Sequence, residues 1–265
     1  MSSFITNPPI TPHQAATAAA ALDVEEAKRA HLVLTLTGAH AYGFPSPDSD
    51  LDLKGVHILP TSRLVGLSKP AEHASRLEVI DGVEIDYASN ELGQVLAGLV
   101  RGYGSYYERL LGMWILRSSP AHEALAPLVQ ASFSRRVFAH YRGFATGQLG
   151  EAEAAPGGVP TAKKLLYVLR TALTGTHLLR SGRLVTDLTQ LVDEHGFSDA
   201  SELLEVKRTG ERSPLPEAMA TKWKARAHEA IALIEASVSA SPLPEEVPNV
   251  AELEAFLIEE RRRRF

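Results

Sequence analysis

The sequence predicts an α+β fold, with a mixed β-sheet core flanked by helices and an all-helical C-terminal part. Before residue 120, short leucine-rich and β-branched runs alternate with helical segments, and an Asp-Gly dipeptide joins two of these runs. After Pro120, apolar residues recur at helical spacing with almost no alternation of the strand type. We therefore predict a core domain of residues 1–120 and a helical domain of residues 121–265.

Composition excludes several classes of protein. The chain has 265 residues, 45% of them hydrophobic, and no cysteine, so disulfides and thiolate metal sites are impossible. The net charge of −5 confines any nucleic-acid surface to a local patch. No secretory signal begins the sequence, and no apolar run approaches the roughly 18 residues that a membrane span needs. We expect a soluble cytoplasmic protein without a membrane partner, and the sequence leaves its oligomeric state open.

The first half of the chain is predicted to contain all the strands. Residues 1–12 are expected to form a flexible arm because prolines interrupt them, and Thr11-Pro12 begins an alanine-rich helix that extends to about Ala30. Asp81-Gly82 suits the two-residue type I′ turn of a hairpin. Further helices are expected from Ser89 to about Val100 and after Ser105. The predicted strands are residues 31–37, 50–58, 76–80, 83–87 and 114–117.

The second half is predicted to be helical. Two segments rich in proline, glycine or both, residues 151–160 and 241–248, are expected to be a loop and a linker. The predicted helices are residues 121–130, 133–149, 162–180, 187–195, 200–207, 216–240 and 250–264.

The chemically unusual feature of the chain is a pair of aspartates, Asp50 and Asp52. They alternate with Leu51 and Leu53, so in a strand both carboxylates project from one face while the leucines point into a core. Two adjacent carboxylates repel each other unless a cation or a proton lies between them. The pair therefore predicts a cation site.

A third carboxylate is expected from the predicted hairpin. If its second strand lies beside the Asp50–Asp52 strand, Asp86 completes a carboxylate trio, with Glu84 as the alternative third member. An oxygen-only cluster favours Mg²⁺ or Mn²⁺ over Zn²⁺. Two such ions about 4 Å apart can clamp the attacking and leaving oxygens of phosphoryl or nucleotidyl transfer. The alternative is that Asp86 is an ordinary outward-facing residue of a half-exposed hairpin.

A helix–loop–helix calcium loop is a competing interpretation of the same aspartates. Counting from Asp48, that loop requires glycine at its sixth position and glutamate at its twelfth, whereas Leu53 and Leu59 stand there. This interpretation is rejected, and Asp48 itself is better explained as a solvated turn residue.

A glycine turn precedes the aspartates. Gly38 follows the strand of residues 31–37, and backbone amides at a glycine turn that opens a short helix can hold phosphate oxygens. A single Gly-Ala step is by itself weak evidence for a phosphate-binding turn, because glycine turns are common. The evidence becomes specific through the number of residues that separate this step from Asp50 and Asp52.

In combination, these residues resemble the nucleotidyltransferase superfamily typified by DNA polymerase beta. Its signature is an apolar strand, Gly-Ser or a small variant, about ten intervening residues, Asp-x-Asp on a strand, and a later third carboxylate. More narrowly, GAHAYG at residues 38–43 followed by SPDSDLD at residues 46–52 is similar to the predicted nucleotidyltransferases of the YcgL and RNA-ligase-associated (RlaP-like) group.

The resemblance implies a nucleotidyltransferase-type core and a metal-dependent enzyme that moves an NMP from an NTP, with ATP expected, to a hydroxyl acceptor. Gly38 and Ala39 match the pair that contacts the triphosphate, although serine is usual where Ala39 stands, and His40 is expected to compensate. Asp50 and Asp52 match the metal-binding pair. Asp86 matches the third carboxylate, which also binds metal and is the general base in polymerising members.

The acceptor is left open. An RNA 3′ end, a protein hydroxyl and a small molecule all remain, with the RNA-ligase association of the group favouring RNA repair by analogy. Two rival functions also remain, a catalytically silent nucleotide-binding module and a metal-dependent phosphohydrolase.

One helix of the second half carries candidate nucleotide-binding residues. Lys163, Tyr167 and Arg170 lie at helical spacing on one face, distinct from an apolar stripe. In related nucleotidyltransferases a helical domain supplies such groups to the nucleotide. The alternative is a solvated charged face. The arginine run of residues 261–264 is explained either as a nucleic-acid contact or as cations that complement a helix C-terminus.

Overall fold

The computed structural model describes residues 4–68, 70–210 and 215–265, which form two compact units. The first unit comprises Met1–Ala41, Asp50–Phe133 and Val247–Phe265, and the second comprises Tyr42–Ser49 and Ser134–Glu246. The predicted boundary near residue 120 differs from this division. The first unit continues to Phe133 and takes in the C-terminal segment, while the short stretch Tyr42–Ser49 belongs to the second unit.

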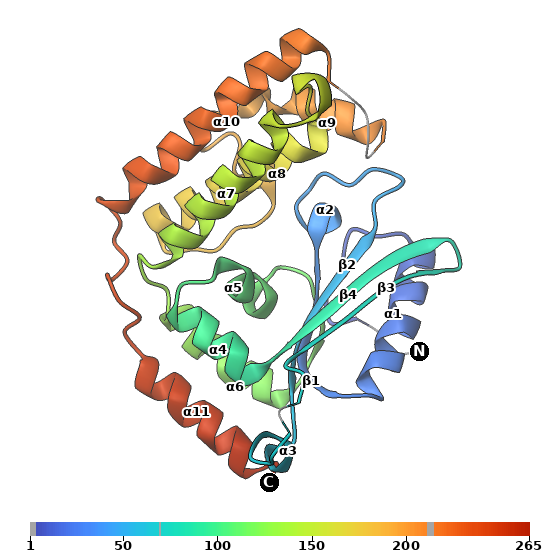
Figure 1. The fold of residues 1–265 in the computed structure, drawn as a ribbon, viewed down its shortest axis with the longest axis vertical. Coiled ribbons are helices and arrows are strands. Elements are labelled where there is room, and N and C mark those ends of the chain that lie inside the picture. Colours follow the sequence, from blue (N-terminus) through green and yellow to red (C-terminus); the bar gives the residue numbers. More distant parts are fainter. Residues whose placement is uncertain (1–3, 69, 211–214) are drawn as a thin grey trace. The chain divides into compact units, whose positions relative to one another are not determined.

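A five-stranded mixed sheet forms the centre of the first unit, with strand order β3-β4-β2-β1-β5 (Figure 1). β2 and β4 are parallel, and the other neighbouring strands are antiparallel. The α+β fold with a mixed sheet and a helical C-terminal part is thus confirmed. The strands are β1 (Ala30–Thr37), β2 (Leu51–Ile58), β3 (His73–Ile80), β4 (Val83–Glu91) and β5 (Ile115–Ser118).

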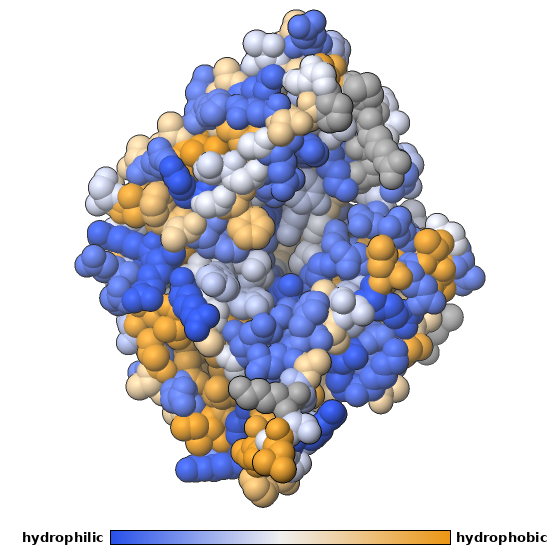
Figure 2. All heavy atoms as spheres, viewed as in Figure 1, coloured by the Kyte–Doolittle hydropathy of each residue, from blue (hydrophilic) through white to orange (hydrophobic). Residues whose placement is uncertain are grey.

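The predicted hairpin is confirmed as the β3–β4 pair. Asp81 and Gly82 both have positive φ, 49° and 79°, as a two-residue type I′ turn requires. The outer strand β3 exposes Leu77 and Val79, which are 69% and 67% accessible. Figure 2 shows hydrophobic residues near the end of this hairpin, with hydrophilic residues beside them.

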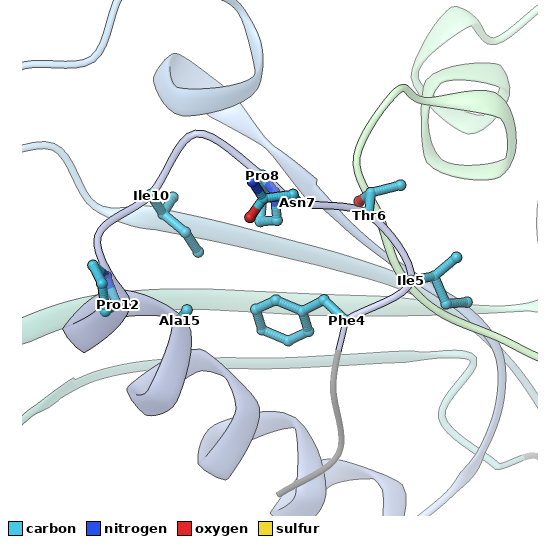
Figure 3. A pocket seen from close by; sticks show the side chains of 8 residues that line it. All are labelled: Phe4, Ile5, Thr6, Asn7, Pro8, Ile10, Pro12 and Ala15. Carbon is cyan, nitrogen blue, oxygen red and sulfur yellow. The ribbon is translucent and has the colours of Figure 1, made fainter.

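Helix α1 (Pro12–Glu26) covers one face of the sheet. Thr11 caps it through a capping box with Gln14, as expected for a Thr-Pro start. The prediction of a flexible arm is wrong for residues 5 and 6: the Ile5 and Thr6 amides donate to the carbonyls of Leu116 and Ile115, each at 3.2 Å. Figure 3 shows the hollow between this segment and α1. It is lined by Phe4, Ile5, Thr6, Asn7, Pro8, Ile10, Pro12 and Ala15.

The leucines that alternate with the aspartates point toward α1. The core on this side contains Leu22 of α1 together with Leu51 and Leu53 of β2 and Ile85 of β4, all of them buried. By the two-residue period of a strand, the residues between them lie on the opposite face. The remaining helices of the first unit are α2 (Gly38–Ala41), α3 (Thr61–Leu64), α4 (Leu92–Val100), α5 (Gly104–Leu111), α6 (Pro120–Ala131) and α11 (Val250–Arg262).

The C-terminal arginines make ion pairs within the first unit. Arg261 pairs with the buried Glu91 at 2.6 Å, and Arg263 and Arg264 pair with Glu260 of the preceding turn. These ion pairs favour a structural role for Arg261, Arg263 and Arg264 over contact with a nucleic acid.

Helix α8 (Ala162–Ser181) is the central helix of the second unit, packed against α7, α9 and α10 (Figure 1). Because it contacts helices on several sides, even most of its polar residues are buried. The other elements are α7 (Val137–Glu153), η1 (Pro156–Gly158), η2 (Leu188–Gln190), η3 (Ser198–Ala200), α9 (Ser201–Arg208) and α10 (Glu217–Val238). None of the helices in the described ranges combines the length and apolarity needed to traverse a bilayer.

The predicted helix of residues 187–195 is wrong. Only Leu188–Gln190 forms a short 3₁₀ helix, and the chain then continues in turns. Asp187 caps the 3₁₀ helix by accepting from the Thr189 amide, and Gly196, with a φ of 78°, ends the turns. A capping residue and a left-handed glycine so close together limit the helix to this length.

Candidate active site

Three aspartates of the first unit lie together at one end of the sheet. The parallel pairing of β2 and β4 places Asp52 in register with Asp86, and Asp50 immediately precedes β2. One carboxylate oxygen from each of the three lies within 4.8 Å of the others. The structure therefore brings together the trio predicted from the sequence, on the face opposite Leu51 and Leu53.

Asp86, rather than Glu84, completes this cluster. Both residues lie on the same face of β4, but Glu84 is two residues nearer the hairpin turn and is paired with Val79. Its side chain is exposed, whereas Asp86 is partly buried. Position along the strand therefore decides between the two carboxylates.

Lys54 is a part of this site that the sequence analysis missed. Its ammonium group donates to Asp86 Oδ2 at 2.8 Å, to the Asp86 carbonyl oxygen at 3.2 Å and to Asp52 Oδ1 at 3.2 Å. The signal was available, because Lys54 continues the alternation of Asp50 and Asp52 and so shares their face. The site thus contains its own cation between two carboxylates.

The electrostatics of the cluster are those of carboxylates held close together. Burial, together with the charges of Asp50 and Asp86, raises the pKa of Asp52 to about 6, while Lys54 acts in the opposite direction. A divalent cation among the three would relieve the same repulsion. The oxygen-only donor set fits Mg²⁺ or Mn²⁺.

The glycine turn touches the cluster directly. Gly38 has a φ of +69°, and a Cβ at this position would lie 1.8 Å from Asp52 Oδ2. Only glycine allows the Asp52 carboxylate to lie against this backbone. The turn and the Asp-x-Asp pair, predicted as separate signals, are therefore one structural unit.

The two residues after Gly38 are buried. Ala39 is packed in the interior, and His40 Nδ1 lies 3.4 Å from the Pro9 carbonyl oxygen. The predicted contacts of Gly38, Ala39 and His40 with phosphate stay predictions.

The stretch Tyr42–Ser49, between the glycine turn and the aspartates, packs within the second unit. The Arg170 guanidinium carbon lies 3.6 Å from the centre of the Tyr42 ring, and the Tyr167 ring meets the Tyr42 and Phe44 rings edge to face. Arg170 is 6% exposed, so the alternative of a solvated charged face is wrong at this position. Lys163 lies over the Tyr167 ring at 5.9 Å.

A buried lysine holds the far end of this stretch. Lys207 of α9 is fully buried, and its ammonium donates to the hydroxyls of Ser46 and Ser49. The Ser46 amide also donates to Ser49 Oγ at 3.0 Å. The serines of the SPDSDLD motif are thereby fixed, and because Lys207 lies far along the chain, no local pattern indicates this contact.

The family match places the chain in the class of nucleotidyltransferases of the DNA polymerase beta type. Residues 15–259 match RlaP, described as an RNA repair pathway DNA polymerase beta family. Because the match extends over most of the sequence, the chain belongs to the RlaP family.

Two individual proteins are similar to the chain. The uncharacterized protein MJ0002 of Methanocaldococcus jannaschii is 28% identical over 229 residues, which are 85% of this chain and 91% of that protein. A nucleotidyltransferase-like protein from Exiguobacterium sibiricum 255-15, solved by crystallography, is 10% identical and has a TM-score of 0.32, covering 94% of this chain and 80% of its own.

Proposed function

We propose that the protein is a metal-dependent nucleotidyltransferase that moves an NMP from an NTP to a hydroxyl acceptor by a two-metal mechanism. The observation that carries the proposal is the cluster of Asp50, Asp52 and Asp86 against the Gly38 turn. Membership of a family of the DNA polymerase beta type supports the same reaction.

Asp50, Asp52 and Asp86 are the residues that would hold Mg²⁺ or Mn²⁺. When bound, the metal supplies charge neutralisation for the triphosphate and for the oxygens that attack and leave. Lys54 neutralises part of the carboxylate charge and fixes the positions of Asp52 and Asp86 through its hydrogen bonds.

Asp86 acts as the general base in the proposed reaction. Its carboxylate takes the proton of the acceptor hydroxyl, and the oxygen forms a bond to the α-phosphorus as the bond to the β-phosphate oxygen breaks. Pyrophosphate leaves with that electron pair, and the proton passes from Asp86 to solvent. Catalysis comes mainly from positioning and charge stabilisation.

The proposed nucleotide-binding groups are of two kinds. The backbone at Gly38 and Ala39, with His40, would contact the phosphates, and ATP is the proposed nucleotide. Lys163, Tyr167 and Arg170 supply the cationic and aromatic groups that bind a triphosphate and stack on a base. Two observations support this assignment: the residue types, and the resemblance of the sequence to nucleotidyltransferases whose helical domain supplies such groups to the nucleotide.

RNA is the proposed acceptor, and a protein hydroxyl is the alternative. The support for RNA is the description of the family as belonging to an RNA repair pathway. The net charge of −5 leaves only a local patch for such a partner.

The test is transfer of label from α-³²P-labelled NTPs to RNA or protein, with Mg²⁺, with Mn²⁺ and with neither. The proposal expects metal-dependent labelling that Asp52→Asn and Asp86→Asn abolish. Glu84→Gln is the matched control, because it removes a carboxylate from the same face of β4 outside the cluster. Labelling that survives both aspartate substitutions contradicts the proposal.

A catalytically silent nucleotide-binding module is the second candidate. Ala39 favours it, because the usual serine at this position supplies a hydroxyl to the phosphates. Tight NTP binding without turnover under any of these conditions would establish this function instead. Release of phosphate from model substrates without a nucleotide would indicate a phosphohydrolase.

A further inference from the structure

A second cluster of metal-ligating side chains lies in the second unit, remote in sequence from the aspartates. His177 belongs to the last turns of α8, and Glu194 and His195 follow η2. One ligand atom from each of the three lies within 4.8 Å of the others. His177 Nδ1 is 3.1 Å from Glu194 Oε1, and His195 Nε2 is 3.9 Å from the same oxygen.

The two imidazoles are buried with unsatisfied nitrogens. The His195 side chain is 1% exposed, and neither of its ring nitrogens has a hydrogen-bond partner among the residues that the structure describes. Within the same residues, Nε2 of His177 also lacks one. A buried polar atom without a partner costs about 1–3 kcal/mol, so the unsatisfied nitrogens of two buried imidazoles beside one carboxylate require an explanation.

We propose that His177, Glu194 and His195 bind a divalent metal ion of the zinc class. The proposal does not depend on the activity of the aspartate cluster.

The donor set is what distinguishes this site. Two imidazoles and one carboxylate are ligands that zinc takes in proteins, with a fourth position left for water. Ligand atoms around a tetrahedral zinc lie about 3.3 Å apart, and the two distances to Glu194 Oε1 lie on either side of this value. Imidazole nitrogens also favour zinc over magnesium, the reverse of the preference of the aspartates.

The surrounding charges are compatible with a cation. Burial lowers the pKa of His195, with His177 and Arg180 acting in the same direction and Glu194 opposing them, so its imidazole is neutral at pH 7. A neutral imidazole is the form that binds metal. Arg180 is held by Ser237, because its Nε donates to Ser237 Oγ at 2.8 Å.

The consequence of metal binding would be structural. His177 lies on the central helix, whereas Glu194 and His195 lie in the turns that end at Gly196. An ion shared by the three would tie these turns to α8. Because 55% of the Glu194 side chain is exposed, solvent reaches the site and an ion can enter.

The experiment is a zinc titration of the full-length protein after chelation, by competition with a chromogenic chelator. Excess Mg²⁺ is kept present to occupy the oxygen-only aspartate site. We expect one zinc equivalent to bind and to raise the Tm. Glu194→Gln should weaken zinc binding at least tenfold, and His195→Asn should abolish it.

Asp193→Asn is the matched control, because it removes a neighbouring exposed carboxylate of the same turn and should leave zinc binding unchanged. Glu194→Gln alters a largely exposed side chain, so it tests the site even if His195→Asn fails to fold. The proposal is overturned if the wild-type protein binds no zinc, or if Glu194→Gln binds zinc as tightly as Asp193→Asn does.

Discussion

Each of the two units brings together three side chains of metal-ligating type, but the two clusters differ in their charge and in their hydrogen bonding. In the first unit three carboxylates repel one another, and Lys54 lies between two of them at hydrogen-bond distance. In the second unit two imidazoles lie beside a single carboxylate, and three of their nitrogens have no hydrogen-bond partner within the described part of the chain. The first cluster therefore has an excess of negative charge with a lysine at hydrogen-bond distance, whereas the second has imidazole nitrogens that lack hydrogen bonds.

This difference indicates which kind of metal ion each cluster favours. Excess carboxylate charge favours a hard divalent ion that can neutralise it, and a resident lysine keeps the arrangement intact without that ion. Unsatisfied neutral nitrogens favour a softer ion and gain little from magnesium. The following predictions test the contrast, beginning with the largest effect.

Asp52→Asn should reduce the proposed nucleotidyl transfer at least a thousandfold, because it removes one of the three proposed metal ligands. Zinc binding in the second unit should not change. The measurement is the initial rate of pyrophosphate release with Mg²⁺, beside a zinc titration of the same variant. A rate within tenfold of the wild type would contradict the role of Asp52.

Gly38→Ala should displace the Asp52 carboxylate, because the new Cβ would lie 1.8 Å from Oδ2. Gly82→Ala is the matched control, since Gly82 also has a positive φ, of 79°, but has nothing within 4 Å of an added Cβ. Both variants should lose about 1–2 kcal/mol of stability through backbone strain. Only Gly38→Ala should lose more than this and also weaken Mg²⁺ binding, measured by urea unfolding and by calorimetry. Equal effects of the two substitutions would show that the carboxylate contact is unimportant.

The sequence predicts the part of the active site that depends on local periodicity. The two-residue period of a strand places Asp50 and Asp52 on one face, and the Asp81-Gly82 turn fixes the strand that carries Asp86. The parallel pairing of β2 with β4 joins two strands that are not consecutive in the sequence. Local sequence patterns do not predict such a pairing, so the placement of Asp86 beside Asp52 could only be assumed.

Contacts between distant parts of the sequence were not predicted. Lys207 meets Ser46 across 161 positions, and neither residue carries a local signal for the other. The pairing of Ile5 and Thr6 with β5 was missed for the same reason, because prolines nearby indicate only that a helix is absent. Lys54 is different, since the alternation that identified the aspartates also includes it.

Lys54→Met should lower the free energy of unfolding by about 1–3 kcal/mol without metal, because Asp52 and Asp86 lose the cation between them. Added Mg²⁺ should stabilise this variant more than it stabilises the wild type. Lys28→Met is the control, because it removes a half-exposed lysine from an ion pair with Glu25, which keeps its ion pairs with Arg29 and Arg76. Urea unfolding with and without Mg²⁺ measures both. An identical response of the two variants to Mg²⁺ would refute the role assigned to Lys54.

Two histidines of the first unit, His31 and His57, should make the stability depend weakly on pH. The pKa of each of these histidines is lowered to about 4, mainly by burial. The charge of Arg29 contributes to the lowering at both, and the charge of His57 contributes at His31. Each has a hydrogen-bond partner: His31 Nε2 contacts the Tyr87 hydroxyl at 2.7 Å, and His57 Nδ1 contacts the Ser89 hydroxyl at 2.8 Å.

The unfolded chain binds protons at these histidines below pH 6.5, whereas the folded chain does not until about pH 4. Stability is therefore complete above pH 6.5 and falls as the pH is lowered through this window, by about 0.7 kcal/mol per histidine between pH 7 and pH 6. Asp52 has the opposite sign, since its raised pKa makes the folded chain bind the extra proton.

The difference between wild type and His57→Gln isolates the histidine contribution from that of Asp52. The variant should lose about 0.7 kcal/mol less than the wild type between pH 7 and pH 6. His13→Gln, which replaces an exposed histidine, should behave as the wild type does. Urea unfolding at the two pH values measures all three proteins. A wild-type pH dependence in His57→Gln would mean that His57 is protonated in the folded protein, and its contact with Ser89 would then be that of a charged donor.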